Sequence, residues 1–220
     1  MINKRVLLLC GHYGSGKTNI AVNLAQKIKR EYPTVTLADL DIVNPYFRSK
    51  DSATELEEAG IRLICSDYAN SNVDIPALPP DLYALTDDRR MRAIIDVGGD
   101  DRGALVLGRL APSLLEENDY EMLMVINCYR PLTRDAASTV EVMREIEYAG
   151  GIRFTALINN SNLGVETTAD DVLASVHYAE EVAAMSGLPV VMTTLDERLQ
   201  SELANKIPNL FPLKLQKKIQ

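Results

Sequence analysis

Short apolar runs alternate with longer amphipathic stretches along the whole chain. The runs are continuous, rich in leucine and β-branched residues, and bounded by polar or glycine-containing segments. Continuous runs of this length are typical of strands that are buried on both faces, as in a parallel sheet. They predict about seven strands, at Arg5–Cys10, Val35–Ala38, Ile61–Ile64, Ala93–Val97, Met122–Asn127, Phe154–Asn159 and Val190–Thr193.

The stretches between these runs carry apolar residues at helical spacing. Helices are predicted at Lys17–Arg30, Asp51–Ala59, Pro80–Asp87, Ala104–Glu117 and Asp196–Asn205. Two more are predicted, one that is capped by Thr133 and ends at Gly150–Gly151, and one that is capped by Thr167 or Thr168 and ends near Gly187. The segment Ser66–Pro80 is predicted to be a loop. Alternating strands and helices predict an α/β fold with three layers and a doubly wound, mostly parallel sheet. Because no linker or repeat is evident, residues 1–220 are expected to form a single domain.

Composition narrows the class of protein. Hydrophobic residues make up 46% and charged residues 25% of the 220 residues, and these fractions are typical of soluble globular proteins. The net charge of −8 argues against a protein that coats DNA or RNA. Three widely spaced cysteines without a CxxC pair argue against a disulfide framework, and no run approaches a membrane span of about 20 residues. We therefore expect a cytoplasmic protein. The segment Leu210–Ile219, which mixes apolar and basic residues, is expected to be a packed or frayed tail.

The most specific motif stands between the first predicted strand and the first predicted helix. It reads Gly11-His12-Tyr13-Gly14-Ser15-Gly16-Lys17-Thr18 and matches G-x-x-x-x-G-K-[ST] in full. Its glycines let successive N–H groups face one anion, and the following helix N-terminus adds positive partial charge. This P-loop is expected to bind phosphate through Gly11, Tyr13, Gly14, Ser15, Gly16, Lys17, Thr18 and Asn19.

Acidic residues follow two of the predicted strands. Asp39 and Asp41 end the second strand, and Asp96, followed by Gly99, ends the fourth. Because ligands of open α/β sheets bind at the carboxyl ends of the strands, we expect these residues to converge beside the P-loop. The expected Mg²⁺ ligands are Thr18, Asp41 and Asp96, and the expected catalytic residues are Lys17, Asp39 and Asp41. A turn-forming or helix-capping role is the alternative for any single aspartate.

With these motifs the chain resembles the MinD/ParA-type P-loop ATPases, a group that includes CobQ/CobB-like proteins and dethiobiotin synthetase. The resemblance implies ATP and Mg²⁺ as cofactors, Asp41 as the residue that orients the attacking water, and Asp96 as the Walker B carboxylate. It also implies that Gly99 senses the terminal phosphate and that Asn159 hydrogen-bonds adenine. No N-K-x-D motif is present, which disfavours guanine.

One position departs from that family. MinD/ParA proteins carry a second lysine directly after the first P-loop glycine, where this chain has His12. The nucleotide-sandwich homodimer of the family is therefore only one possibility. Arg48 or Arg102 are candidates for the missing charge, although a surface arginine is commonly just solvated. The segment Asn44–Arg48 is either a switch loop that contacts a partner or a second substrate, or a loop whose aromatic residues pack beneath it.

Three functions fit these features. The first is an ATP-driven switch that binds ATP or ADP and acts on a partner protein. The second is a small-molecule kinase or ligase of the dethiobiotin-synthetase kind. The third is a nucleotide-binding regulator that hardly hydrolyses ATP. Cys10, Cys65 and Cys128 are interpreted as ordinary small residues, and His177 as a surface or packing residue.

Overall fold

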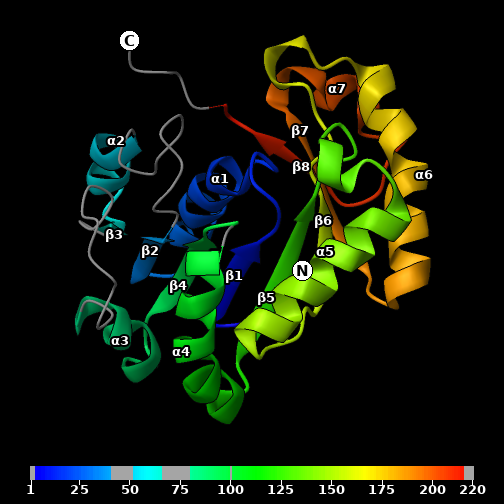
Figure 1. Cartoon of the computed structure of the whole chain (residues 1–220). Coiled ribbons are helices and arrows are strands. Elements are labelled where there is room, and N and C mark those ends of the chain that lie inside the picture. Colours follow the sequence, from blue (N-terminus) through cyan, green and yellow to red (C-terminus); the bar gives the residue numbers. More distant parts are fainter. Residues whose placement is uncertain (1–2, 41–51, 66–79, 100, 216–220) are drawn as a thin grey trace.

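The structure of the protein is a computed structural model that describes residues 3–40, 52–65, 80–99 and 101–215 (Figure 1). Eight strands form one sheet in the order β3-β2-β4-β1-β5-β6-β7-β8, and every neighbouring pair is parallel. The strands are β1 (Val6–Cys10), β2 (Val35–Leu40), β3 (Arg62–Cys65), β4 (Arg92–Val97), β5 (Tyr120–Ile126), β6 (Ala156–Asn159), β7 (Val190–Asp196) and β8 (Leu210–Leu213). The seven strands expected from the sequence are present at the expected places.

Helices cover both faces of this sheet. They are α1 (Lys17–Lys29), α2 (Ala53–Glu58), α3 (Pro80–Asp87), α4 (Asp101–Glu117), α5 (Ala136–Gly150), α6 (Ala169–Ser186) and α7 (Gln200–Leu203). Side chains of β1 alternate between the two faces. Leu7 and Leu9 join the core beneath α1 and α2, whereas Leu8 and Cys10 join the core beneath α3, α4, α5 and α6. The three-layer, doubly wound α/β fold predicted from the sequence is confirmed.

The ends of the long helices follow local sequence signals. Thr168 caps α6 through a reciprocal capping box with Asp171, and Gly187 ends this helix with a φ of 74°. The expected cap of α5 was wrong, because Asp135 accepts the hydrogen bond from the Ser138 N–H at that position. Thr133 instead lies in a preceding 3₁₀ turn, where its buried hydroxyl donates to the Asn127 carbonyl.

The eighth strand was not expected from the sequence. Residues Leu210–Leu213 add β8 to the edge of the sheet, parallel to β7, and Pro212 is tolerated there because an edge strand has one unpaired side. Phe211 and Leu213 are buried in the core beneath α1. The tail expected at this place is therefore a packed strand as far as Leu213.

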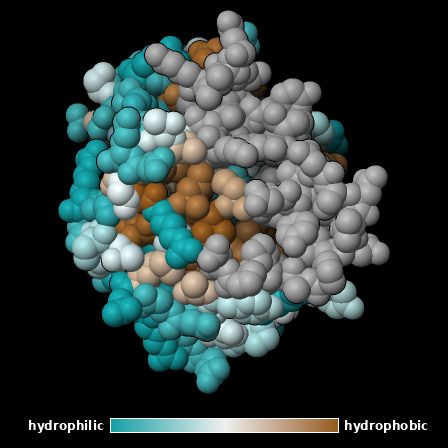
Figure 2. Space-filling view, turned by 90° about the vertical axis from the view of Figure 1, so that its left-hand side faces the viewer, coloured by the Kyte–Doolittle hydropathy of each residue, from teal (hydrophilic) through white to brown (hydrophobic). Residues whose placement is uncertain are grey.

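The opposite edge of the sheet is β3. In this strand Ile64 is buried, whereas Leu63 and Cys65 are half-buried. Figure 2 views the molecule from this side and shows apolar surface set among polar residues. None of the helices in the described ranges is long and apolar enough to cross a membrane.

Several residues singled out from the sequence lie outside the described residues. They are Asp41, the Asn44–Arg48 segment, residues 66–79 of the predicted Ser66–Pro80 loop, and the side chain of Arg102. Their roles, like the single domain expected over residues 1–220, remain predictions.

The burial of Phe211 yields a first prediction. We expect Phe211→Ala to lower the free energy of unfolding by about 3–5 kcal/mol, because a large buried ring leaves the core. Leu132→Ala is the control, since Leu132 is 55% exposed and its removal is expected to cost less than about 0.5 kcal/mol. Urea denaturation measures both values. A cost for Phe211→Ala as small as that of the control would show that β8 is not part of the folded sheet.

Candidate functional site

The P-loop packs so closely against its neighbours that it has no room for side chains at two of its glycines. Gly11 has a φ of 148° and Gly16 a φ of 90°. A Cβ atom at Gly11 would collide with the Val125 carbonyl of β5, and one at Gly16 would collide with the Asn160 side chain. The loop therefore owes its shape to close contacts with the Val125 carbonyl of β5 and with the Asn160 side chain after β6.

The first turn of α1 leaves backbone donors at the end of the P-loop. Gly16 is the N-cap residue, it makes no side-chain capping bond, and the first turn holds no acidic residue. A helix N-terminus of this kind has N–H groups and a positive partial charge that are suited to an anion.

Lys17 folds back over the loop that precedes it. Its side chain is 4% exposed, and Nζ donates to the carbonyl oxygens of Gly11 at 3.0 Å and His12 at 3.3 Å. It forms no ion pair with a carboxylate in the described part of the chain. Because charge-assisted hydrogen bonds to phosphate are stronger than those to neutral carbonyls, Lys17 is positioned to exchange these acceptors for a bound phosphate.

Two carboxylates lie on the β4 side of the loop. Asp39 of β2 and Asp96 of β4 are partners in the sheet register, and both side chains are buried. The Thr18 hydroxyl donates to Asp96 Oδ2 at 2.6 Å, which links the end of the P-loop to this pair. The structure thus brings Thr18, Asp39 and Asp96 together as the sequence predicted.

These oxygen atoms suit Mg²⁺. Mg²⁺ prefers hard oxygen ligands and keeps several waters, so it commonly needs only one or two protein side chains besides substrate phosphates. Within the described residues, no group of three or more His, Cys, Asp or Glu side chains could hold a metal ion by itself. The Thr18–Asp96 pair therefore fits a Mg²⁺ ion that is shared with phosphate, and not a closed all-protein metal cage.

Two further features mark the inside of the P-loop. Ser15 Oγ is buried and has no hydrogen-bond partner among the described residues. Buried hydroxyl groups are normally hydrogen-bonded, and a bound anion would satisfy this donor.

Gly99 lies against the loop, where a Cβ atom would be 2.8 Å from the Gly11 oxygen and the Tyr13 nitrogen. The β4 end is therefore in direct backbone contact with the P-loop.

Asn160 ties the P-loop to the β6 side of the sheet. Its Nδ2 donates to the Ser15 carbonyl at 2.6 Å, and its Oδ1 accepts from the Thr194 hydroxyl of β7. The side chain is 3% exposed, so both bonds are sheltered from water. Asn160 therefore holds the loop at a fixed distance from β6 and β7.

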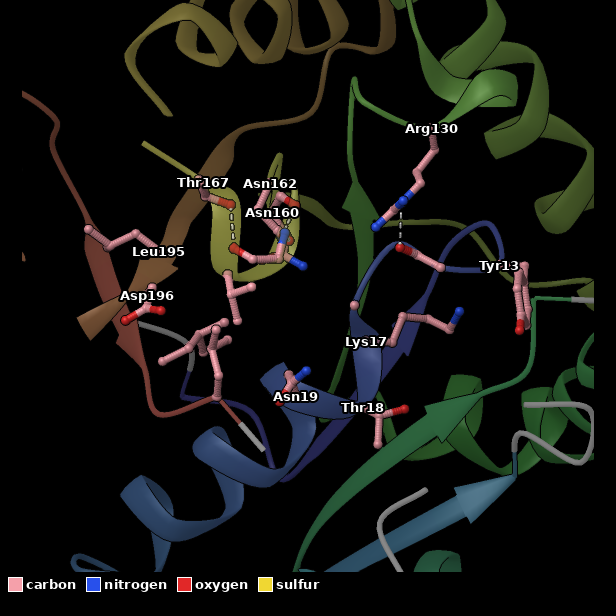
Figure 3. Close-up of a pocket in the computed structure, with 16 residues that line it drawn as sticks. Tyr13, Lys17, Thr18, Asn19, Arg130, Asn160, Asn162, Thr167, Leu195 and Asp196 are labelled. Carbon is pink, nitrogen blue, oxygen red and sulfur yellow. Dashed lines mark hydrogen bonds between the residues drawn. The ribbon is translucent and has the colours of Figure 1, made fainter. Parts of the chain in front are cut away.

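A pocket of about 380 Å³ opens beside the P-loop (Figure 3). This volume is within the range of small-molecule sites. Its wall is formed by Tyr13, Gly14, Gly16, Lys17, Thr18, Asn19, Arg130, Asn160, Asn162, Gly164, Val165, Thr167, Leu195, Asp196, Leu213 and Leu215. One end therefore carries the P-loop and its lysine. The other end is lined by polar and apolar groups from the segment after β6 and from the carboxyl ends of β7 and β8.

The structure places Asn159 behind the pocket wall. Its side chain is fully buried, where Nδ2 donates to the Ser175 hydroxyl at 3.0 Å and Oδ1 accepts from the Ser161 N–H. The neighbouring Asn160 and Asn162 line the pocket in its place. This geometry does not support a direct contact between Asn159 and a base.

The remaining candidates have ordinary surroundings. His12 is half-buried, and its Nδ1 lies 3.0 Å from the Tyr13 carbonyl oxygen. His177 is 81% exposed beside Glu181, as expected of a surface residue. Cys10, Cys65 and Cys128 form no disulfide with one another. Burial raises the pKa of the Cys10 thiol far above its usual range, partly offset by Lys17. Cys10 is therefore a neutral core residue beneath the loop.

Comparison with solved structures reveals a shared fold. The cell division protein FtsY of Thermotoga maritima matches with a TM-score of 0.59 and 19% identity, over 89% of this chain and 63% of that one. FlhF complexed with GTP and Mg²⁺ matches with a TM-score of 0.52 and 18% identity, over 86% of this chain and 64% of that one. Chloroplast FtsY of Physcomitrella patens matches with a TM-score of 0.55 and 18% identity, over 87% of this chain and 58% of that one.

The chain has the α/β fold of P-loop NTPases. It spans less than two thirds of the length of each of these structures, and the low identities establish likeness of fold alone. No family model and no curated protein matches the sequence. The matched structures are FtsY and FlhF proteins, so they support the P-loop NTPase fold and do not support the narrower MinD/ParA resemblance.

Three residues of the site were missed or undervalued in the sequence: Arg130 and Asn160 line the pocket, and the buried Asn127 supports the turn that carries Arg130. Asn127 and Arg130 follow β5, and Asn160 follows β6, so all three stand at carboxyl ends of strands. That position is the signal that could have identified them, because it is the edge where ligands of such sheets bind. Without the strand order, however, the sequence gives no reason to place Arg130 next to Gly14.

Asn160 provides a prediction for the site. We expect Asn160→Ala to lower the free energy of unfolding by about 1–3 kcal/mol, because the buried Ser15 carbonyl and Thr194 hydroxyl lose their partner. It is also expected to speed hydrogen exchange at the P-loop amides. Thr194→Val is the control, since it leaves the Asn160–Ser15 bond in place. Equal exchange at the loop amides in both variants would contradict the role given to Asn160.

Proposed function

We propose that this protein binds a purine nucleoside triphosphate with Mg²⁺, hydrolyses it, and acts as a nucleotide-driven switch on a partner protein. The observation that carries the proposal is the Lys17 side chain, which is buried against a glycine-shaped loop and, among the described residues, bonds only to the neutral carbonyls of Gly11 and His12. The pocket beside it is large enough for a small molecule and lies at the ligand-binding edge of the sheet.

Different residues bind the phosphates and the Mg²⁺ ion. The P-loop amides and Lys17 hold the phosphates, and Thr18 and Asp96 hold Mg²⁺. Mg²⁺, when bound, neutralises charge on the phosphate oxygens. Asn160 keeps the loop in its binding shape by holding the Ser15 carbonyl.

Hydrolysis needs a positioned water and little covalent chemistry from the protein. We assign the positioning of water to Asp41, which is only two residues beyond the buried Asp39. Gly99 touches the P-loop backbone, so a terminal phosphate on the loop would lie close to the β4 end. Loss of that phosphate would remove its contact with the β4 end, which is how a partner protein would distinguish the triphosphate state from the diphosphate state.

The identity of the base is a finer question. The absence of an N-K-x-D motif favours ATP, whereas FlhF, one of the matched structures, is complexed with GTP and Mg²⁺. The far end of the pocket offers Asn162, Thr167 and Asp196 as polar groups for a base. We propose ATP as the natural ligand, and competition between MgATP and MgGTP for one labelled nucleotide measures this preference directly.

Lys17 gives the sharpest test of nucleotide binding. We expect Lys17→Ala to weaken binding of the triphosphate by about 30-fold or more, because a buried charge leaves the phosphate site. The fold should be retained, since Lys17 makes no ion pair within the described residues. Lys29→Ala, in the last turn of the same helix, is the control and is expected to bind normally. Unchanged affinity in Lys17→Ala would contradict the proposal.

The carboxylates test hydrolysis separately from binding. Asp41→Ala is expected to lower the hydrolysis rate by about 100-fold while nucleotide affinity is retained. Asp96→Asn is expected to raise the Mg²⁺ concentration needed for hydrolysis by at least about tenfold, because the side chain beside Thr18 loses its negative charge and one of its two oxygens. Steady-state phosphate release over a Mg²⁺ titration measures both.

The same assay separates the alternatives. A regulator that does not hydrolyse nucleotide would show no rate loss in Asp41→Ala. A small-molecule kinase or ligase would turn over triphosphate only when its second substrate is added. Slow hydrolysis by the wild-type chain alone, lost in Asp41→Ala, is the result that the switch predicts.

A further inference from the structure

Arg130 places a second positive charge on the wall of the pocket. Its Nε donates to the Gly14 carbonyl of the P-loop at 2.8 Å. The two terminal nitrogens have no hydrogen-bond partner, and the guanidinium forms no ion pair, in the part of the chain that the structure describes. Figure 3 shows this side chain reaching from the turn after β5 to the loop. Lys17 and Arg130 are the only cationic residues among the described residues that line the pocket.

The turn that carries Arg130 is built around a buried asparagine. Asn127 is fully buried, its Oδ1 accepts from the Tyr129 N–H at 2.9 Å, and its carbonyl accepts from the Arg130 N–H at 3.2 Å. The Thr133 hydroxyl donates to the same carbonyl at 2.7 Å. Arg130 is therefore held in place before any ligand arrives, so binding would cost less ordering of its backbone.

The sheet order places Arg130 opposite the carboxylates. The P-loop follows β1, which lies between β4 and β5. Asp96 and Thr18 stand on the β4 side of the loop, whereas Arg130 stands on the β5 side. The pocket extends from there toward Asn162 and Leu195, after β6 and in β7. Arg130 thus stands between the P-loop and the far end of the pocket.

We propose that Arg130 binds the phosphate chain of the nucleotide on the side away from Mg²⁺, through its two terminal nitrogens, while its Nε holds the loop. This inference rests on the proposed function. The guanidinium is planar and permanently charged, and it matches phosphate oxygens in a fork geometry. Because Arg130 stands on the β5 side of the loop, opposite Thr18 and Asp96, we expect it to contact phosphates that diphosphate and triphosphate share, and not the terminal phosphate.

Arg130→Gln tests this contact, because glutamine can still donate to the Gly14 carbonyl but carries no charge. Affinities for the Mg-diphosphate and the Mg-triphosphate are expected to fall by a similar factor of about tenfold, with a weaker dependence on salt than in the wild type. Affinity for the nucleoside without phosphate is expected to stay the same. Arg130→Lys is expected to recover part of the lost phosphate affinity. Titration calorimetry at several salt concentrations measures all of these quantities.

Arg134→Gln is the matched control. Arg134 lies four residues further on, is 78% exposed and pairs with Asp135, so its removal changes the net charge equally without touching the pocket. Its nucleotide affinity is expected to equal that of the wild type. Thermal denaturation of each variant measures whether the fold is kept.

Three results would overturn the inference while leaving the proposed function intact. They are equal affinities in Arg130→Gln and the wild type, a loss confined to the triphosphate, and a loss that does not depend on salt. The last would show that Arg130 only shapes the loop. A wild-type chain that binds neither nucleotide would overturn both proposals together.

Discussion

The close packing of the P-loop backbone against residues of β5 and the segments after β4 and β6 is the constraint on which the site depends. Gly11 meets the Val125 carbonyl, Gly16 meets Asn160, and Gly99 meets the loop from the β4 side. Side chains at these positions would collide with their neighbours, so the loop is held in one shape by contacts on both sides. That shape leaves the N-terminus of α1 and Lys17 at one end of the pocket, where the phosphates are proposed to bind.

Charge is separated across this edge of the sheet. Buried carboxylates, Asp39 and Asp96, stand on one side of the loop, and Arg130 stands on the other. Lys17 lies in the loop between them and bonds to backbone carbonyls. A protein with a net charge of −8 thus concentrates positive charge at one place, which is the arrangement that a phosphate chain with one Mg²⁺ ion requires.

Much of the fold could be predicted because parallel strands that are buried on both faces leave uninterrupted apolar runs. β8 was missed because a four-residue strand with Pro212 has no such signature, and its place follows only from packing against β7. At the site, the P-loop and the places of Asp39 and Asp96 at the carboxyl ends of strands follow from local motifs, whereas their register follows from the pairing of β2 with β4. Arg130 and Asn160 do not follow from local motifs, because their roles come from strand order: β5 and β6 bring them beside Gly14 and Ser15 across long sequence separations.

A crystal structure with a non-hydrolysable triphosphate and Mg²⁺ tests the central claim most directly. The account predicts that Lys17 Nζ leaves the carbonyls of Gly11 and His12 for phosphate oxygens, with the loop amides around the same phosphates and Mg²⁺ beside Thr18 and Asp96. A nucleotide bound elsewhere, with Lys17 still bonded to those two carbonyls, would contradict it.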